Sequence, residues 1–513
     1  MMTLSITQQD NLDQKINEAF SNTTGWFVDA VFAEIPVTDS VGIPWVLIIL
    51  ILGASYFTFY FKGINLRAFP TAVNVVRGKY DDLEAGAKVL VSEEVVTVDG
   101  DQLDTLRVEG HDGEVSHFQA LTAALSATVG LGNIAGVAIA LSIGGAGATF
   151  WMILAGLLGM ASKFVECTLG VAYREINHHG IVYGGPMYYL KNGLRDIGKG
   201  RLGKILSVMF AIMCVGASFG GGNMFQANQA FKLFEFVSGG EESFFFGKGW
   251  LFGLVMAIFV GIVIIGGIKK IAKVTDKIVP AMVLMYVLVV VIILGMNYEN
   301  IPSAFSAILK GAFNAQGVTG GMIGVMVQGF RRAAFSNEAG IGSASIAHAA
   351  VRTRYAASEG LVALLEPFID TVVVCTMTAL LLIITGQITV GNEVSFEQGV
   401  ILTSNALAQG FSWFPYLLTV AVILFAFSSM ISWSYYGHQA WSFLFGRGKR
   451  AEYLYKSIFC VFVIVGAAAS LGAVVDFSDA MVFSMMVPNM IGLVLLAPKV
   501  SVELKRYINT IRS

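Results

Sequence analysis

Eleven apolar stretches, each long enough to cross a lipid bilayer as a helix, constrain the fold of this chain more than any other feature. The hydrocarbon core of a bilayer is about 30 Å thick and is crossed by roughly 20 apolar residues in helical conformation. The stretches fall at 43–62, 118–147, 149–173, 203–231, 249–268, 275–296, 321–350, 358–386, 414–445, 455–474 and 478–498. This pattern predicts an all-α polytopic membrane protein with about eleven transmembrane helices.

The composition excludes a water-soluble fold. Of the 513 residues, 55% are hydrophobic and only 13% are charged, whereas soluble domains carry roughly 25% charged residues. The formal net charge of -2 gives no basic surface for nucleic acid. The cysteines lie inside apolar stretches without zinc-ligand spacing, so they are interpreted as packing residues and no cofactor is expected. They are Cys167, Cys214, Cys375 and Cys460.

Positive charges between the stretches indicate the orientation of the chain. Lys and Arg concentrate in alternate loops, at 62–79, 174–204, 269–273, 352–354, 447–456 and 499–506. In contrast, residues 387–413 contain Glu393 and Glu397 but no Lys or Arg. Because cytoplasmic loops carry the excess of Lys and Arg, the N-terminus is expected outside the cell and the C-terminus in the cytoplasm.

With the first stretch set aside, the other ten form two halves of five. The expected units are an external N-terminal segment at 1–42, an accessory transmembrane helix at 43–62, a cytoplasmic loop at 63–117, a first five-helix repeat at 118–296, an external linker at 297–320, a second five-helix repeat at 321–498 and a cytoplasmic tail at 499–513. An odd number of helices per half makes the two halves enter the membrane from opposite sides, which predicts an inverted repeat.

Two segments outside the repeats carry local patterns of their own. Apolar residues at helical spacing from Trp26 to Ile35 predict a short helix on the membrane surface or an ordinary packing helix. Residues 83–112 contain short β-rich runs on either side of Asp99-Gly100, a turn signal. We expect either a small β-ribbon insertion or a flexible one.

The first helix of each repeat is interrupted by glycine and polar residues. Ser126–Asn133 breaks the first stretch of one half, and Ser336–Ser343 breaks the first stretch of the other. Paired interruptions of this kind point to a transporter binding site, because unwound carbonyls coordinate a cation and half-helix N-termini attract a carboxylate. The alternative is that the glycines only allow close helix packing.

Two short motifs match enzyme patterns by spacing, but their surroundings in the sequence do not fit an enzyme site. Residues 216–220 fit the GxSxG pattern of hydrolases, yet they lie inside an apolar stretch without a preceding strand. Residues 130–135 fit a dinucleotide fingerprint by spacing alone. Without HExxH or a carboxylate pair at ligand spacing, no enzyme is expected.

Three motifs, at Ala123–Val137, Gly184–Tyr189 and Phe335–Gly340, resemble those of the alanine or glycine:cation symporter family, a prokaryotic branch of the leucine-transporter fold. The likeness covers nearly the whole chain from about residue 15. It implies sodium-coupled uptake of alanine, glycine or a similar small amino acid by alternating access in a bacterial or archaeal cell membrane. Proton coupling and a channel are the alternatives, and the oligomeric state stays open.

The resemblance implies two sodium sites built from oxygen ligands, which suit a hard monovalent cation. One sodium is expected at the carbonyl of Thr128 and the side chain of Asn133, and the second between backbone carbonyls of the first break and two serine hydroxyls. The residues assigned to sodium are Ser126, Thr128, Val129, Asn133, Ser428 and Ser429.

The resemblance also implies a substrate site at the first break. The residues assigned to the substrate are Gly130, Gly132, Asn133, Gln226, Phe335 and Trp433. Backbone amides at 130–133 are expected to hold the carboxylate, and Gln226 to orient the amino group. Phe335 and Trp433 are expected to limit the size of the side chain, so bulky aromatic substrates should clash while glycine and serine still enter.

Charged residues inside apolar stretches are functional candidates because their burial is expensive. They include Glu166, Arg331, Arg332 and Glu338. Glu338, next to the second break, is expected to fix the unwound backbone or to act as a gate, with Arg331 or Arg332 as its partner. A purely structural ion pair is the alternative.

Overall fold

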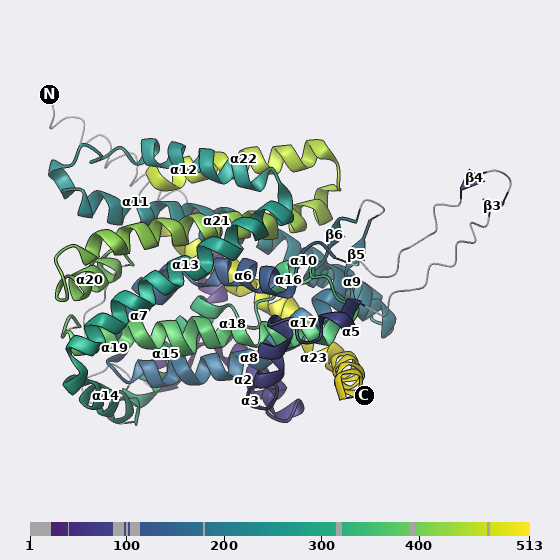
Figure 1. Cartoon of the computed structure of the whole chain (residues 1–513), viewed down its shortest axis with the longest axis horizontal. Helices are drawn as coiled ribbons and strands as arrows, with labels where there is room; N and C mark the ends of the chain where they lie inside the picture. The colour runs from purple at the N-terminus through teal and green to yellow at the C-terminus, as the bar shows by residue number, and fades with distance from the viewer. Residues whose placement is uncertain are drawn as a thin grey trace.

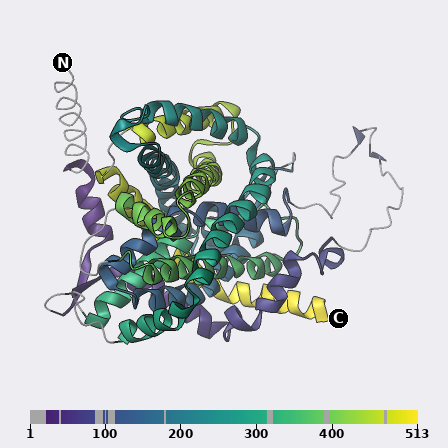
Figure 2. The ribbon, with the colours of Figure 1, turned by 60° about the vertical axis from the view of Figure 1, so that its left-hand side comes forward.

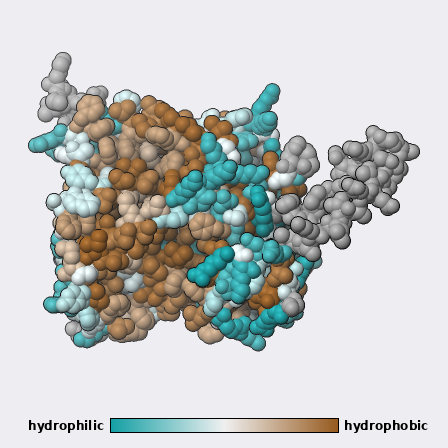
Figure 3. Space-filling view, in the orientation of Figure 1, coloured by the Kyte–Doolittle hydropathy of each residue, from teal (hydrophilic) through white to brown (hydrophobic). Residues whose placement is uncertain are grey.

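The structure is a computed structural model, and it describes residues 22–38, 41–85, 97–98, 101–102, 113–177, 180–313, 321–388, 396–468 and 472–512. Long helices run side by side through the molecule (Figure 1), and the view turned by 60° shows the same bundle (Figure 2). Apolar side chains cover a broad band of the face seen in Figure 3, and hydrophilic side chains gather towards its ends. Such a band is what a lipid-facing surface requires.

The N-terminal part precedes the first half. Its elements are β1 (Glu34–Thr38), β2 (Val41–Pro44), α2 (Trp45–Tyr60), α3 (Ile64–Arg67), α4 (Phe69–Val76), α5 (Asp81–Ala85), β3 (Thr97–Val98) and β4 (Asp101–Gln102). The first half holds α6 (His117–Thr128), η1 (Gly132–Gly136), α7 (Val137–Gly144), α8 (Ala148–Ala172), β5 (Glu175–Ile176), β6 (Val182–Tyr183), α9 (Pro186–Asp196), α10 (Gly200–Phe219), η2 (Gly220–Met224), α11 (Phe225–Val237), η3 (Gly240–Glu242), α12 (Gly249–Ile264) and α13 (Gly267–Met296).

The remaining elements comprise those of the expected linker, η4 and α14, and those of the expected second repeat and tail. They are η4 (Tyr298–Asn300), α14 (Ile301–Phe313), α15 (Gly321–Asn337), α16 (Ala344–His348), α17 (Ala356–Ala363), α18 (Leu365–Pro367), η5 (Phe368–Cys375), α19 (Thr376–Ile384), α20 (Phe396–Ala408), α21 (Phe414–Phe445), α22 (Lys449–Ala468) and α23 (Gly472–Arg512). In Figure 1, α14 and α20 lie at one end of the bundle, and α5, the β5–β6 pair and the C-terminus lie at the other.

The prediction of an all-α multi-pass membrane protein is confirmed at the level of class. Within the described residues, seven helices are long and apolar enough to cross a membrane, or eight if the bent pair His117–Thr128 and Gly132–Gly144 forms one span. The other predicted stretches correspond to α2 and α12, with 16 residues each, and to α15 with α16. The count of eleven and the inverted repeat stay predictions.

Both predicted interruptions are breaks in the structure. After α6 the chain is extended at Val129, with φ -72° and ψ 106°, and the two half-helices differ in direction by 56°. After α15, Glu338, Gly340 and Gly342 have φ of 52°, 86° and 101°. Positive φ costs glycine nothing but strains other residues, so Glu338 is held in a strained conformation next to two permissive glycines.

Two local expectations fit only in part. The helix expected from Trp26 to Ile35 ends at residue 31, because Ile35 lies in β1, which pairs antiparallel with β2. In the expected ribbon, β3 and β4 pair antiparallel, and the Asp99-Gly100 turn between them lies outside the described residues, as does most of the segment 83–112.

Candidate functional site

A small cavity lies where the two broken helices meet. Its walls come from the first break, from η2 and α11, from the end of α15 and from α21 and α23. The lining residues are Ala127, Thr128, Gly130, Leu131, Gly132, Gly221, Phe225, Gln226, Phe335, Glu338, Ser429, Trp433, Asp479 and Val482. The cavity therefore brings together segments that are more than 300 positions apart in the sequence.

Most residues assigned to the substrate lie in this wall. Gly130, Gly132, Gln226, Phe335 and Trp433 line the cavity. Asn133, the remaining one, is not among the lining residues, and its side chain turns away into a buried polar cluster described below.

Gln226 is the amide side chain among the lining residues of the cavity. Its Nε2 donates to the carbonyl of Gly221 at 3.2 Å. Its Oε1 is buried and has no hydrogen-bond partner within the described residues. An unsatisfied buried acceptor costs free energy, so this oxygen is suited to accept a hydrogen bond from a bound ammonium group.

The amides of the first break are only partly available to a ligand. The amide of Gly130 donates to Asn133 Oδ1 at 2.7 Å, so the chain itself uses it. Leu131 and Gly132 stand at the start of the second half-helix, where the first amides have no partner inside the helix. Such amides, with the positive end of the helix dipole, favour a carboxylate.

Two aromatic residues form the apolar part of the wall. Trp433 is 3% exposed and its ring contacts Tyr436 with centroids 5.4 Å apart. Gly222 packs so tightly on it that a Cβ there would lie 2.3 Å from Trp433 Cγ. Phe335 meets Phe225 edge-on with centroids 6.4 Å apart. The packing on Trp433 fixes its ring, so the space beside it is limited.

Asn133 belongs to a buried polar cluster beside the cavity. Its Nδ2 donates to Asp370 Oδ1 at 2.7 Å and to Ser336 Oγ at 3.0 Å. Ser336 Oγ donates to Asp370 Oδ2 at 2.8 Å, and Thr371 Oγ1 does the same at 2.8 Å. All four side chains are at most 2% exposed. The cluster thus joins the first break, the second break and the π-helical segment η5.

Asp370 was not predicted from the sequence. It is an acid inside the apolar stretch 358–386, so the rule that singled out Glu338 applies to it equally. Within the described residues its hydrogen-bond partners are neutral amide and hydroxyl groups. A buried carboxylate without a compensating cation is costly, and carboxylate, hydroxyl and amide oxygens are the ligands that hard cations prefer.

The residues assigned to the second cation join α6 to α21. Ser429 Oγ donates to the carbonyl of Ser126 at 3.0 Å, and Ser126 Oγ donates to the carbonyl of Ser428 at 2.6 Å. The Ser428 hydroxyl instead donates to Phe425 of its own helix at 3.0 Å. The structure therefore brings Ser126 and Ser429 together near Val129. The hydroxyl of Ser428 points away from them, towards the carbonyl of Phe425.

Glu338 bridges the second break by a hydrogen bond. It accepts this bond from the Ser343 hydroxyl across the unwound segment. Arg331 and Arg332 lie about two helical turns before the break, and their expected partnership with Glu338 stays a prediction.

Lys163 and Glu166 belong to a second buried group of charges. Lys163 Nζ lies 3.0 Å from Glu366 Oε1 and 3.8 Å from Glu166 Oε1. Asn489 donates to Glu166 Oε2 at 3.3 Å. Glu166 is therefore paired within the bundle.

Comparison with known proteins gives consistent matches over most of the chain. The model of the sodium:alanine symporter family matches residues 28–513. The sodium/alanine symporter AgcS of Methanococcus maripaludis is 42% identical over 406 residues, 79% of this chain and 86% of that protein. The probable sodium/glutamine symporter GlnT of Bacillus subtilis is 32% identical over 464 residues, 90% and 87% of the two chains.

The crystal structure of MhsT in complex with L-phenylalanine has the same fold. Its TM-score with this chain is 0.54 at 16% sequence identity, and the match covers 75% of this chain and 90% of MhsT. At this identity the likeness concerns the fold alone.

Proposed function

We propose, since the chain belongs to the sodium:alanine symporter family, that it carries a small amino acid such as alanine or glycine into the cell together with sodium. The family and the relatives are transporters, so the chain is a transporter and not an enzyme. The substrate, the coupling cation and the direction of transport are the parts that we propose.

The cluster of Asn133, Ser336 and Asp370 carries the proposal of a cation. It places a carboxylate, a hydroxyl and an amide within 3.0 Å of one another between the two broken helices. Rotation of the serine hydroxyl and the asparagine amide would turn three oxygens towards a bound ion. Sodium, a hard monovalent cation, would neutralise the buried charge of Asp370.

The cavity next to this cluster supports a small zwitterionic substrate. The amides of Leu131 and Gly132 would hold its carboxylate, and Gln226 Oε1 would accept a hydrogen bond from its ammonium group. Phe335 and Trp433 would close over the side chain. The relatives include symporters named for alanine and for glutamine, and we place this chain with the small substrates because the packing on Trp433 restricts the space.

The proposed cycle is alternating access. The cavity lies between the two halves of the chain, so rocking of one half against the other would open it to each side in turn. The lysine- and arginine-rich end, which holds α5 and the C-terminus, would face the cytoplasm, with the N-terminus outside the cell membrane.

Reconstituted protein tests the proposal. Proteoliposomes should accumulate radiolabelled alanine above the external concentration when sodium is imposed outside. Accumulation driven by an imposed proton gradient without sodium would replace sodium by the proton as the coupling ion. Flux that only equilibrates alanine, whatever the sodium gradient, would indicate a channel and refute symport.

A further inference from the structure

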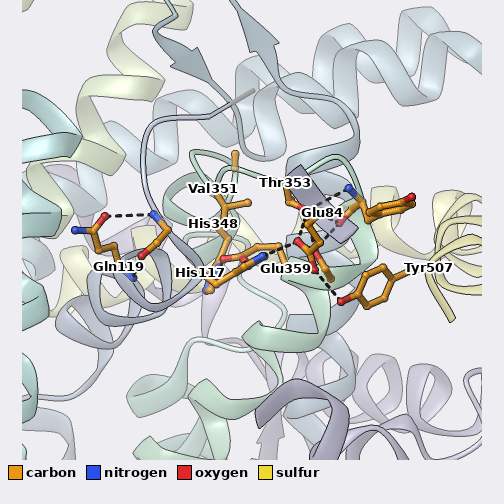
Figure 4. A network of polar contacts seen from close by, with 12 residues as sticks. Glu84, His117, Gln119, His348, Val351, Thr353, Glu359 and Tyr507 are labelled. Carbon is orange, nitrogen blue, oxygen red and sulfur yellow. Dashed lines mark hydrogen bonds and ion pairs between the residues drawn. The ribbon is translucent and has the colours of Figure 1, made fainter. Parts of the chain in front are cut away.

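A buried network of polar side chains (Figure 4) lies at the end of the molecule that holds α5 and the C-terminus (Figure 1), which is the end predicted to face the cytoplasm. It joins five parts of the chain: α5, the first residue of α6, the segment from α16 to α17, α17 itself and the C-terminal end of α23. Its members are Glu84, His117, His348, Thr353, Ser358, Glu359 and Tyr507. None of them lines the cavity or belongs to the proposed cation sites.

His117 stands at the centre of this network. Its Nε2 lies 2.7 Å from Glu84 Oε2, and its Nδ1 contacts Glu359 Oε2. The other oxygen of Glu359 lies 2.5 Å from Nδ1 of His348. His117 is 7% exposed and Glu359 is fully buried. Since removing one partner of a buried charge pair is strongly destabilising, α6 is held firmly to α17 and α5 at this end.

Glu84 also accepts hydrogen bonds from side chains of three further segments. Its Oε2 accepts from the Thr353 hydroxyl at 2.6 Å and the Ser358 hydroxyl at 3.0 Å, and its Oε1 accepts from the Tyr507 hydroxyl at 2.8 Å. Burial raises the pKa of Glu84, but the hydrogen bond and charge of His117 outweigh burial and hold this pKa below its usual value. Glu84 is therefore an ionised hydrogen-bond acceptor that links α6, α17 and α23.

The C-terminal end of α23 packs against the rest of the protein through Tyr507. The residue lies beyond 478–498, the last predicted membrane stretch, yet it is fully buried. Its ring packs against Tyr355 with centroids 5.6 Å apart and against Tyr80 with centroids 6.5 Å apart. The C-terminal end of α23 thus packs against α5 and the start of α17.

The network lies where the cavity would have to open towards this end. Between the two, Ala124 of α6, Cys167 of α8, Ala344 of α16 and Ala363 of α17 form a separate buried apolar cluster. Release of a solute at this end requires α6 to move away from α16 and α17. That movement would break the contacts of His117 and expose Cys167 to water.

We propose that Glu84 and Tyr507 are positioning residues for transport, which hold α6 closed at the cytoplasmic end and make the C-terminal helix part of the inner gate. This rests on the proposed function, because a gate has meaning only for a protein that opens to both sides. Loss of either contact should shift the protein towards the inward-open state.

Native Cys167 reports this shift directly. Membranes are treated with N-ethylmaleimide, and labelling of each cysteine is followed by mass spectrometry of its peptide. In Y507F, which removes one hydroxyl and keeps the ring packing, and in E84Q, labelling of Cys167 should be about two- to tenfold faster, the range expected for loss of one hydrogen bond. Cys214, which is equally buried in α10, should label at the wild-type rate.

Matched controls come from the same end of the molecule. Tyr453 of α22 is 57% exposed, so Y453F removes an equivalent hydroxyl without touching the network. Glu503 of α23 is also partly buried and pairs with Lys499 at 2.9 Å, outside the network, so E503Q controls for E84Q. Both should label like the wild type.

An unchanged rate of Cys167 labelling in Y507F would contradict the proposed gate. An equal increase in the labelling rates of Cys167 and Cys214 would contradict it as well. If E84Q fails to fold, Y507F alone decides the question. Labelling needs neither sodium nor alanine transport, so failure of the gate and failure of sodium coupling are separate outcomes.

Discussion

The side-chain amide of Asn133 lies 2.7 Å from a carboxylate oxygen of Asp370, 237 positions further along the chain. Asn133 sits at the first break and Asp370 in the π-helical segment η5, so this contact fastens the first half of the chain to the second. Ser336 of the second break completes the group. The proposed cation site is therefore also a junction between the two halves, which gives a bound ion a direct influence on how they are held together.

Replacing Asp370 by asparagine should weaken sodium dependence. The substitution keeps the shape and one oxygen but removes the charge that would compensate a cation. Loss of a charged interaction corresponds to about 1.5–3 kcal/mol, so the sodium concentration for half-maximal alanine uptake should rise about tenfold or more. E299Q, at an exposed acid of η4, serves as the control. An unchanged sodium response in D370N would remove this residue from the site.

Gly222 should control access for the substrate side chain. A Cβ at position 222 would lie 2.3 Å from Trp433 Cγ, whereas a Cβ at Gly295 of α13 would meet nothing within 4 Å. In G222A the tryptophan must shift, and we expect alanine uptake to fall relative to glycine uptake. G295A, at a glycine that is not among the lining residues of the cavity, should keep the wild-type ratio. Equal ratios of alanine to glycine uptake in the two variants would contradict a size limit set by Trp433.

Gln226 should contribute to binding rather than to folding. Its Oε1 is unsatisfied within the described residues, so Q226L removes no internal contact of that oxygen, and only the bond from Nε2 to Gly221 is lost. Loss of a hydrogen bond to the substrate ammonium should raise the KM for alanine about tenfold or more, with a smaller change in the maximal rate. Q409L, at an exposed glutamine after α20, is the control. A normal KM in Q226L would assign the ammonium to another acceptor.

The sequence predicted what depends on local pattern, and missed what depends on contacts between distant segments. Apolar length gave the membrane stretches, and glycine with polar residues gave both breaks, because these signals are local in the chain. The rule on charges in apolar stretches marks Asp370 as a candidate, but its hydrogen bonds to Asn133 and Ser336 arise only where η5 packs against both breaks. The hydrogen bond of Glu338 to Ser343 likewise depends on how the chain is unwound between the two residues.

The two serines of α21 should differ in their effect on sodium, although the resemblance assigned both to the second cation. The Ser429 hydroxyl points to the carbonyl of Ser126 at the end of α6, where a cation would find both oxygens. The Ser428 hydroxyl donates to Phe425 in its own helix and contacts Met282 Sδ of α13 at 3.7 Å, so it points away from the Ser126 carbonyl. S429A should therefore raise the half-saturating sodium concentration more than S428A, measured by alanine uptake at varied sodium. The two variants remove the same atom from neighbouring residues, so each controls for the other. A larger effect of S428A would mean that the Ser428 side chain rotates to the ion when sodium binds.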